Sequence, residues 1–395
     1  MFLDSIISDK TSRLQFLQCS ACDRQYDKFE RITFAKCDSC SGNPIIATYD
    51  LRKSKPKRII DKKENSMWRY RSLLPLTEVK NKVSLGEGWT PILSLSTLKS
   101  KYELDWLMMK DESRNPTGSF KARGLSMAVS KAKELGIESC IIPTAGNAGG
   151  AMSAYCAKAG ISSVVVMPSH TPEAFKKECL YFGAELILVD GLISDCAKKV
   201  REISKVKDCF DVSTMKEPYR LEGKKTMGYE IAEQLNWELP DVILYPTGGG
   251  TGLIGMWKAF HEMQELKWIG KKLPRMIAVQ TESIRPVVNE FFGINPTEKD
   301  HVKTIANGLA VPNPFALQLM IQVIKESNGT AIAVTDREII ESLKEIAQTE
   351  GMFISPEGAA LIPALKKLLK EGAITQSDKI LLLNTGSAYK YLENL

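Results

Sequence analysis

The sequence predicts an α/β protein with two doubly wound parallel-sheet domains, preceded by a small N-terminal cysteine ribbon. Three observations support this fold class. Short apolar runs typical of buried strands alternate with helical patterns, glycine-rich turns follow several of these runs, and four cysteines form two Cys-x-x-Cys pairs near the N-terminus. With 395 residues, the chain is long enough for two or more domains, each with its own core.

The two cysteine pairs, Cys19-Ser-Ala-Cys22 and Cys37-Asp-Ser-Cys40, predict a structural metal site within a ribbon over 1–48. Each pair can place two thiolates on one side of a tight turn, and two pairs complete a tetrahedral zinc site. Because sulfur fills all four positions, the zinc would be closed to substrate. The total of nine cysteines is odd, which favours thiols over disulfides in a reducing compartment.

A basic, proline-containing connector follows the ribbon. Its charge is concentrated in Arg52-Lys-Ser-Lys-Pro-Lys-Arg58, which we expect to be solvated. A short helix is predicted over 67–74, a loop over 86–91 and a buried strand over 106–109. The segment 49–114 is therefore predicted to be a linker together with the first part of the large domain.

The stretch after this strand, Asn115-Pro-Thr-Gly-Ser-Phe-Lys121-Ala-Arg-Gly124, contains the strongest candidate for a catalytic residue. Its proline and glycine indicate a tight turn, and helical spacing extends over 120–135. Lys121 would then lie in the first turn of a helix, where the helix dipole disfavours a cation and lowers its pKa. A lysine in this position is suited to be a neutral amine, and hence a nucleophile or a Schiff-base partner.

Strands and helices then alternate at the spacing of parallel βαβ units. The strands are predicted over 139–143, 163–167 and 185–189, and the helices over 151–158, 172–182 and 194–206. The glycine-rich turn Thr144-Ala-Gly-Asn-Ala-Gly-Gly150 joins the first of these strands to its helix. These elements form a small α/β domain predicted over 115–214.

A second α/β stretch is predicted to form the large domain over 215–395. Its helices are predicted over 222–235, 314–326, 336–349 and 359–369, and its strands over 241–245, 276–280, 330–335 and 379–383. Pro246-Thr-Gly-Gly-Gly-Thr-Gly252 joins a strand to a helix from Leu253, and offers backbone N–H groups and a positive helix end to an anion. Because it lacks the Walker and dinucleotide patterns, the predicted ligand is the phosphate monoester of a cofactor.

Composition argues against several other classes of protein. The 53 basic and 47 acidic residues give a net charge of only +6, too slight to imply a nucleic-acid partner. No apolar run is long enough to span a membrane, and the N-terminus has no secretion signal, so we expect a cytoplasmic protein. The three histidines lie outside the glycine loops and give no support to a histidine-based triad.

Taken together, these motifs resemble those of the pyridoxal-phosphate enzymes with the tryptophan synthase β-subunit fold. Within that group they are most similar to the threonine synthases that carry an N-terminal four-cysteine extension. The resemblance spans roughly Gly86 to Tyr391, with the motifs in the family's order. It implies that pyridoxal 5'-phosphate lies between the two domains, and that Lys121 binds it covalently and then acts as both base and acid.

The resemblance also implies roles for the other motifs. Asn147 would hydrogen-bond the phenolic oxygen of the cofactor, and Thr385 would face the pyridine nitrogen. The cofactor phosphate would be bound by Gly248, Gly249, Gly250, Thr251 and Gly252. The substrate would be bound by the backbone N–H groups of Thr144, Ala145 and Gly146, and by Arg220 and Lys224.

The activity implied is the conversion of O-phosphohomoserine and water to L-threonine and phosphate, by γ-elimination and β-addition of water, in a homodimer. The segment Glu217-Pro-Tyr-Arg-Leu-Glu-Gly-Lys-Lys-Thr226 is typical of threonine synthases, apart from Glu217, where they have asparagine. Ala122 replaces their usual aspartate and Ala148 a common threonine, and Phe120-Lys-Ala-Arg123 and Thr304–Gly308 resemble serine/threonine dehydratases instead. A dehydratase, or replacement chemistry on another phosphorylated amino acid, therefore stays an alternative.

Overall fold

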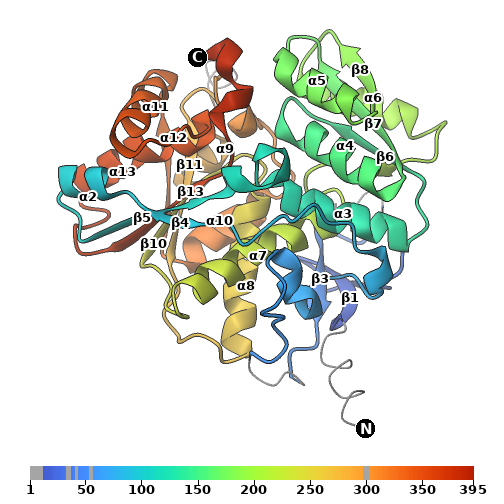
Figure 1. Ribbon diagram of the computed structural model, residues 1–395, viewed down its shortest axis with the longest axis horizontal. Coiled ribbons are helices and arrows are strands. Elements are labelled where there is room, and N and C mark those ends of the chain that lie inside the picture. The colour runs from blue at the N-terminus through green and yellow to red at the C-terminus, as the bar shows by residue number, and fades with distance from the viewer. Residues whose placement is uncertain (1–11, 33–36, 41–42, 53–56, 297–302) are drawn as a thin grey trace.

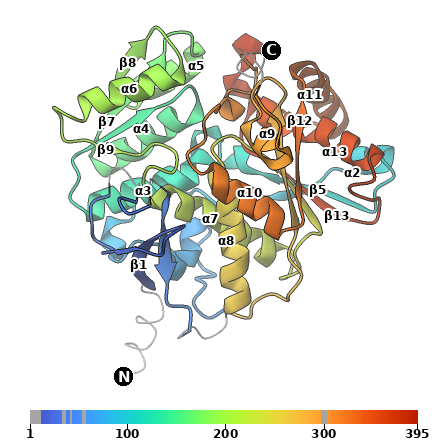
Figure 2. The same ribbon diagram turned by 180° about the vertical axis from the view of Figure 1, so that it is seen from behind.

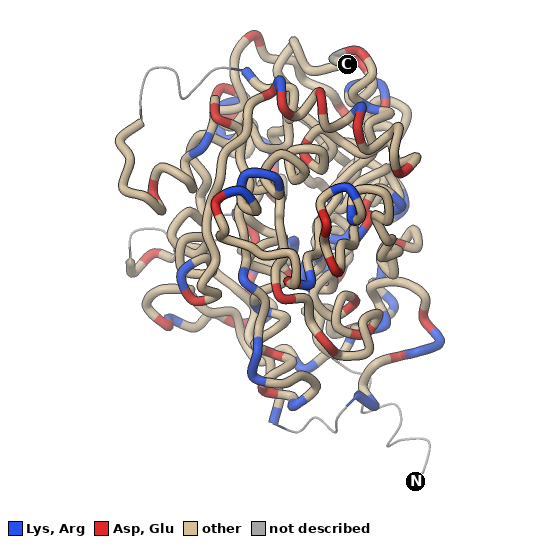
Figure 3. Tube along the Cα trace, turned by 90° about the vertical axis from the view of Figure 1, so that its left-hand side faces the viewer, with Lys and Arg blue, Asp and Glu red and all other residues tan. Residues whose placement is uncertain are grey.

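The computed structural model describes residues 12–32, 37–40, 43–52, 57–296 and 303–395, so most of the predicted basic run at 52–58 lies outside them. Three sheets organise the described chain (Figures 1 and 2). Basic and acidic residues are interspersed along the trace (Figure 3). Within the described ranges, no helix combines the length and apolar character needed to cross a membrane.

The N-terminal sheet is small and antiparallel, with the order β2-β1-β3. Its strands are β1 (Leu14–Cys19), β2 (Gln25–Tyr26) and β3 (Ile45–Tyr49). Leu17 and Ala47 are buried in the main core, so the sheet packs against the rest of the protein. The predicted short helix at 67–74 is a 3-10 helix, η1 (Met67–Leu73).

The largest sheet has six strands in the order β12-β11-β10-β13-β5-β4. Five of them are parallel: β5 (Trp106–Asp111), β10 (Val242–Pro246), β11 (Arg275–Thr281), β12 (Thr330–Val334) and β13 (Lys379–Asn384). The edge strand β4 (Ile92–Ser94) is antiparallel to β5, and the sequence analysis does not predict it. Its short length and polar serine give no strand pattern.

Helices cover both faces of this sheet, as in a doubly wound fold (Figure 1). Alternate residues of β13 face opposite cores, since Leu381 and Leu383 pack in one and Ile380 and Leu382 in the other. One core contains residues of α7 (Tyr219–Gln234), α8 (Thr251–Glu265), α9 (Pro286–Phe292) and α10 (Leu317–Glu326). The other contains residues of α2 (Ser96–Lys101), α11 (Asp336–Glu350), α12 (Pro356–Ala359) and α13 (Leu361–Lys370).

The third sheet is fully parallel, with the order β8-β7-β6-β9. Its strands are β6 (Ser139–Pro143), β7 (Ser162–Pro168), β8 (Glu185–Val189) and β9 (Phe210–Asp211), and its helices are α4 (Asn147–Ala159), α5 (Glu173–Tyr181) and α6 (Ile193–Ile203). Helix α4 begins at Asn147, earlier than the predicted residue 151. Gly150 lies inside this helix and does not form a turn. A Cβ at this position would lie 1.8 Å from a Glu178 carboxylate oxygen, so glycine allows α4 to pack closely on α5.

Helix α3 (Lys121–Glu134) connects the parallel sheets, because it packs on both α4 and α7. It contacts α7 at Gly223, where a Cβ would lie 2.1 Å from the carbonyl oxygen of Arg123. Only glycine permits this approach. The contact brings the first turn of α3, with Lys121, beside the first turns of α7, with Arg220 and Lys224.

Candidate active site

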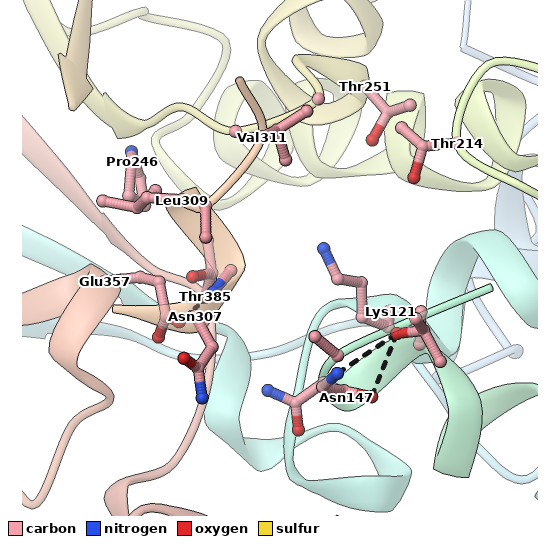
Figure 4. Close-up of a pocket in the computed structure, with 18 of the residues that line it drawn as sticks. Lys121, Asn147, Thr214, Pro246, Thr251, Asn307, Leu309, Val311, Glu357 and Thr385 are labelled. Atoms are coloured by element: carbon pink, nitrogen blue, oxygen red, sulfur yellow. Dashed lines mark hydrogen bonds between the residues drawn. The ribbon is translucent and has the colours of Figure 1, made fainter. Parts of the chain in front are cut away.

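A cavity of about 140 Å³ lies where the carboxyl ends of β10 and β13 face the turn between β6 and α4. Open α/β sheets bind their ligands at this edge. The residues of the predicted site that line the cavity are Lys121, Thr144, Ala145, Gly146, Asn147, Gly248, Gly249, Gly250, Thr251 and Thr385. In Figure 4, Lys121 and Asn147 lie on the side opposite Glu357, Asn307 and Thr385.

Lys121 is the first residue of α3, as predicted, and its side chain opens into the cavity. Within the described chain its ammonium group has no hydrogen bond or ion pair, and its Nζ lies 4.3 Å from the centre of the Phe120 ring. Burial and the nearby charge of Arg220 lower the pKa of Lys121 to about 8, although Glu357 opposes the shift. A substantial neutral fraction near neutral pH makes Lys121 a competent nucleophile and base.

The glycine loop before α8 forms another wall. No hydrogen bond donated by the backbone N–H groups of Gly248, Gly249 or Gly250 is found among the described residues, so these donors are available at the start of α8. A Cβ on Gly248 would lie 2.3 Å from the carbonyl oxygen of Gly308, which excludes larger residues. Gly252 is not at the cavity surface, because it packs against the Tyr245 hydroxyl.

The turn between β6 and α4 supplies Asn147 and the predicted carboxylate site. Asn147 donates through Nδ2 to the Tyr391 hydroxyl (3.2 Å), and its buried Oδ1 has no partner in the described part of the protein. Two of the three N–H groups predicted to bind the substrate carboxylate donate to other groups in this structure. That of Thr144 donates to the Val166 carbonyl (3.0 Å), and that of Gly146 donates to the Thr144 hydroxyl (3.2 Å).

Arg220 and Lys224, which are predicted to bind substrate, are not among the residues that line the cavity. Both are fully buried on α7, behind the cavity wall. Lys224 donates to the Thr251 hydroxyl (2.6 Å), and burial with the charges of Lys121 and Arg220 lowers its pKa well below the ordinary value. Arg220 donates to the Val212 carbonyl (2.6 Å), while its Nε and Nη2 have no partner among the described residues.

Three buried carboxylates act on these cations of α7: Glu217 and Asp211 on Arg220, and Glu217 and Glu112 on Lys224. Glu217 accepts hydrogen bonds from the backbone N–H groups of Tyr219 (2.6 Å) and Arg220 (3.0 Å). Burial raises the pKa of Glu217 to about 7, against the opposing effect of Arg220. Arg220 still has two donor atoms without a partner among the described residues, which suits a phosphate group.

Sequence analysis missed several residues that line the cavity, notably Asn307, Glu357 and Tyr391. Glu357 accepts hydrogen bonds from the Gly308 N–H (2.7 Å) and the Tyr391 hydroxyl (2.9 Å). A glutamate between proline and glycine at a helix start is the signal that could have identified it. Asn307 lies in the Thr304–Gly308 stretch that resembles dehydratases, and this motif could have identified it, whereas no local pattern marks Tyr391.

A wider cavity of about 710 Å³ adjoins the first and shares Ala145, Ile193, Asn307 and Ala310 with it. Its lining is mostly apolar, with His170 and Lys303 among the charged or ionisable exceptions. The shared residues come from both parallel-sheet units. The wider cavity therefore lies beside the cavity that Lys121 lines.

The four N-terminal cysteines form a separate cluster. The sulfur atoms of Cys19, Cys22, Cys37 and Cys40 all lie within 4.8 Å of one another. Cys19 and Cys37 are buried, whereas Cys22 is exposed. The predicted pairing of the two Cys-x-x-Cys motifs is therefore confirmed as a spatial cluster of four thiols.

Comparison with known proteins places this fold and site in a defined class. The sequence model of the family "Pyridoxal-phosphate dependent enzyme" matches residues 83–386. The diaminopropionate ammonia lyase of Escherichia coli shares the fold, with a TM-score of 0.67, 17% sequence identity and coverage of 87% of this chain and 94% of that one. The fold and the lysine-centred cavity thus define a pyridoxal-phosphate-dependent enzyme.

Two relatives identify the family within this class. The threonine synthase of Methanocaldococcus jannaschii is 34% identical over 382 residues, which cover 94% of this chain and 92% of the relative. The threonine synthase of Methanosarcina acetivorans is 34% identical over 379 residues, or 95% and 92% of the two chains. The chain belongs to the threonine synthase family of pyridoxal-phosphate-dependent enzymes.

The residues present fit this cofactor. Among the described residues, the amine of Lys121 has no competing partner, the N–H groups of the glycine loop are free to bind a phosphate, and Asn147 Nδ2 makes one hydrogen bond, which leaves its second N–H for a ring oxygen. Thr385 lines the same cavity. The donors and the reactive amine thus face one cavity, as a phosphorylated aldehyde requires.

Proposed function

We propose that the protein is a threonine synthase, which converts O-phosphohomoserine and water to L-threonine and phosphate. The observation that carries this proposal is similarity to threonine synthases over 94% of the chain, which extends beyond the cofactor-binding region. The buried guanidinium group of Arg220, with two donor atoms unpartnered among the described residues, supports a substrate with its own phosphate.

In this proposal, some of the cavity residues bind the cofactor, and Lys121 transfers protons. Pyridoxal phosphate, when bound, withdraws electrons from the substrate carbon that carries the amino group. Lys121 removes the proton from that carbon and later returns one, which its lowered pKa of about 8 favours. Asn147 and Thr385 hold the cofactor ring, and Gly248–Thr251 bind its phosphate.

The substrate phosphate is assigned to the cationic region behind Thr214 and Thr251. Arg220 has two unpartnered donors within the described chain, and its guanidinium group can pair with phosphate in a bidentate manner. Reaching it requires a small movement of the wall, because the side chain is fully buried. The N–H of Ala145 donates no hydrogen bond within the described part of the chain, so it is the remaining backbone donor for the substrate carboxylate.

We further propose that the cysteine cluster binds one structural zinc ion and that the protein is a cytoplasmic homodimer. Four cysteine sulfur atoms within 4.8 Å of one another support zinc, which prefers four such ligands, and the free cysteines support a reducing compartment. The proposed units are the ribbon (1–48), the linker and first part of the large domain (49–114), the small domain (115–214) and the remainder of the large domain (215–395).

The proposal is tested by supplying O-phosphohomoserine and L-threonine separately to the purified holoenzyme. Release of phosphate with formation of threonine is expected from the first. Formation of 2-oxobutanoate from threonine, with no phosphate release from O-phosphohomoserine, would support the alternative dehydratase. O-phosphoserine in a third assay tests for replacement chemistry on another phosphorylated amino acid.

A further inference from the structure

One hydroxyl group connects the two parallel-sheet units across the cavity. Tyr391 follows η7 (Ala388–Lys390), beyond the last strand of the large sheet, and is only 1% exposed. Its hydroxyl lies 2.9 Å from Glu357 Oε1, on α12, and 3.2 Å from Asn147 Nδ2, at the start of α4. Tyr391 therefore contacts one residue on a helix of the large sheet and one residue on a helix of the smaller parallel sheet.

The direction of both hydrogen bonds follows from the chemistry of the groups. A tyrosine hydroxyl has one hydrogen, and a carboxylate can only accept, so Tyr391 donates to Glu357. Burial raises the pKa of Tyr391 well above its ordinary value, which keeps this hydrogen in place. Only lone pairs remain for Asn147, so the amide must turn its NH₂ group toward Tyr391. The second hydrogen of that NH₂ group has no partner in the described chain.

Tyr391 is held in place independently of Asn147. Its ring contacts that of Phe175, on α5, edge to face, with centroids 5.4 Å apart. Next to it, Lys390 pairs with Glu178, also on α5, at 2.7 Å, and donates to the Thr117 carbonyl (2.6 Å). Glu357 Oε1 is itself held in place by a second hydrogen bond, from the Gly308 N–H. The hydroxyl is thus a fixed point against which the amide orients.

We propose that Tyr391 is a positioning residue, which fixes the Asn147 amide so that it presents an N–H, and not its carbonyl oxygen, to the ring oxygen of pyridoxal phosphate. The proposal rests on the proposed function only for the identity of this cofactor. An acceptor oxygen on the cofactor would be repelled by the amide carbonyl, so a misoriented Asn147 weakens binding.

Titration of the cofactor-free full chain with pyridoxal phosphate tests the proposal, with visible absorption as the readout. Tyr391→Phe is expected to weaken the binding of pyridoxal phosphate by about 10-fold, because the Asn147 amide is no longer held to donate a hydrogen bond to the charged ring oxygen. The pH midpoint of the absorption band should shift for the same reason. Tyr389→Phe is the matched control. Tyr389 lies on the 3-10 helix just before Tyr391, is 70% exposed and packs its ring on that of Phe353, so the titration of this variant should match the wild type.

A double-mutant cycle separates positioning from simple packing. In an Asn147→Ala background, Tyr391→Phe should change affinity by less than about 2-fold, because the amide it orients is gone. An equal loss of affinity in both backgrounds would overturn the proposal. If Tyr391→Phe does not fold, Glu357→Gln serves instead. It retains the shape but removes the charge that directs the hydrogen bond, and an unchanged titration would also overturn the proposal.

The two proposals fail in different ways. A wild type that forms no threonine, but whose Tyr391→Phe variant still binds the cofactor about 10-fold more weakly, would retain the positioning role and reject the threonine synthase activity. A wild type that forms threonine, with a Tyr391→Phe variant that titrates like it, would do the reverse. A wild type that binds no pyridoxal phosphate would overturn both.

Discussion

The ammonium group of Lys224 donates a hydrogen bond of 2.6 Å to the hydroxyl of Thr251, and so joins helix α7 to the glycine loop. Lys224 and Lys121 also lie against the same ring, that of Phe120, with Nζ atoms 4.0 and 4.3 Å from its centre. The charge of Lys121 helps to lower the pKa of Lys224, and the charge of Arg220 helps to lower the pKa of Lys121. The guanidinium group of Arg220 thus favours the neutral amine of Lys121 and can also attract phosphate.

The lowered pKa of Lys121 predicts the pH dependence of cofactor attachment. Only the neutral amine attacks an aldehyde, so the rate at which cofactor-free protein gains visible absorption should rise with pH, with a midpoint near 8. Lys121→Ala should show no band that disappears with borohydride. A rate that is constant between about pH 7 and 9 would contradict the assigned state of Lys121.

Replacement of Arg220 should separate substrate binding from cofactor binding. Arg220→Met removes two unpartnered donors, and we expect KM for O-phosphohomoserine to rise about 10-fold or more. It should also raise the pKa of Lys121, because a nearby positive charge is lost. Arg114→Met, at an exposed position before the lysine loop, is the control in steady-state assays. Equal KM values for both variants would exclude Arg220 from the phosphate site.

The raised pKa of Glu217 predicts a stability cost at alkaline pH. The folded-state pKa of about 7 lies above the ordinary 4.5, so the folded protein binds more protons between these values. Stability attributable to this residue is therefore lost as the pH rises through 7. Glu217→Gln should stabilise cofactor-free protein at pH 8.5 by up to about 3 kcal/mol, and much less at pH 5. Urea unfolding at both pH values measures the difference, and an equal effect at both would contradict it.

Tyr49 connects the small N-terminal sheet, which carries the cysteine cluster, to α7, because its hydroxyl donates to the buried carboxylate of Glu222 (2.7 Å). Loss of the cluster should therefore lower the stability of the whole protein. We expect Cys37→Ser to lower the zinc content measured by atomic absorption and to lower Tm by several degrees, because the small sheet loses its cross-link. Tyr49→Phe should lower Tm with zinc retained. Cys196→Ser, a buried cysteine outside the cluster, is the control for zinc content. Full zinc in Cys37→Ser would refute the assignment.

Patterns that lie within a short stretch were predictable from the sequence. The parallel sheets, the cysteine cluster, and the positions of Lys121 and the glycine loop all follow from local spacing. The start of α4 was not predicted, because Gly150 looks like a turn residue until the contact with Glu178 is known. Tyr391 was missed because its partner Asn147 is 244 positions away.

The predicted substrate-binding residues also show the difference between local sequence patterns and contacts made only in the folded protein. Arg220 was recognised from its motif, but whether it lies at or behind the cavity surface depends on how α3 and α7 pack at Gly223. The backbone donors of Thr144 and Gly146 illustrate the same point. Their use by Val166 and by the Thr144 hydroxyl is a property of the folded sheet and turn, which the sequence motif does not contain.

The order of strands in the largest sheet has a consequence for how the protein is made. Strand β13 lies between β10 and β5, yet it is the last strand to be synthesised, and residues 112–378 separate it from β5. On the ribosome, the sheet formed by β6–β9 can be completed long before its larger neighbour. The large sheet must keep a gap at its centre until β13 emerges, so this step should be the one most exposed to aggregation and most dependent on chaperones.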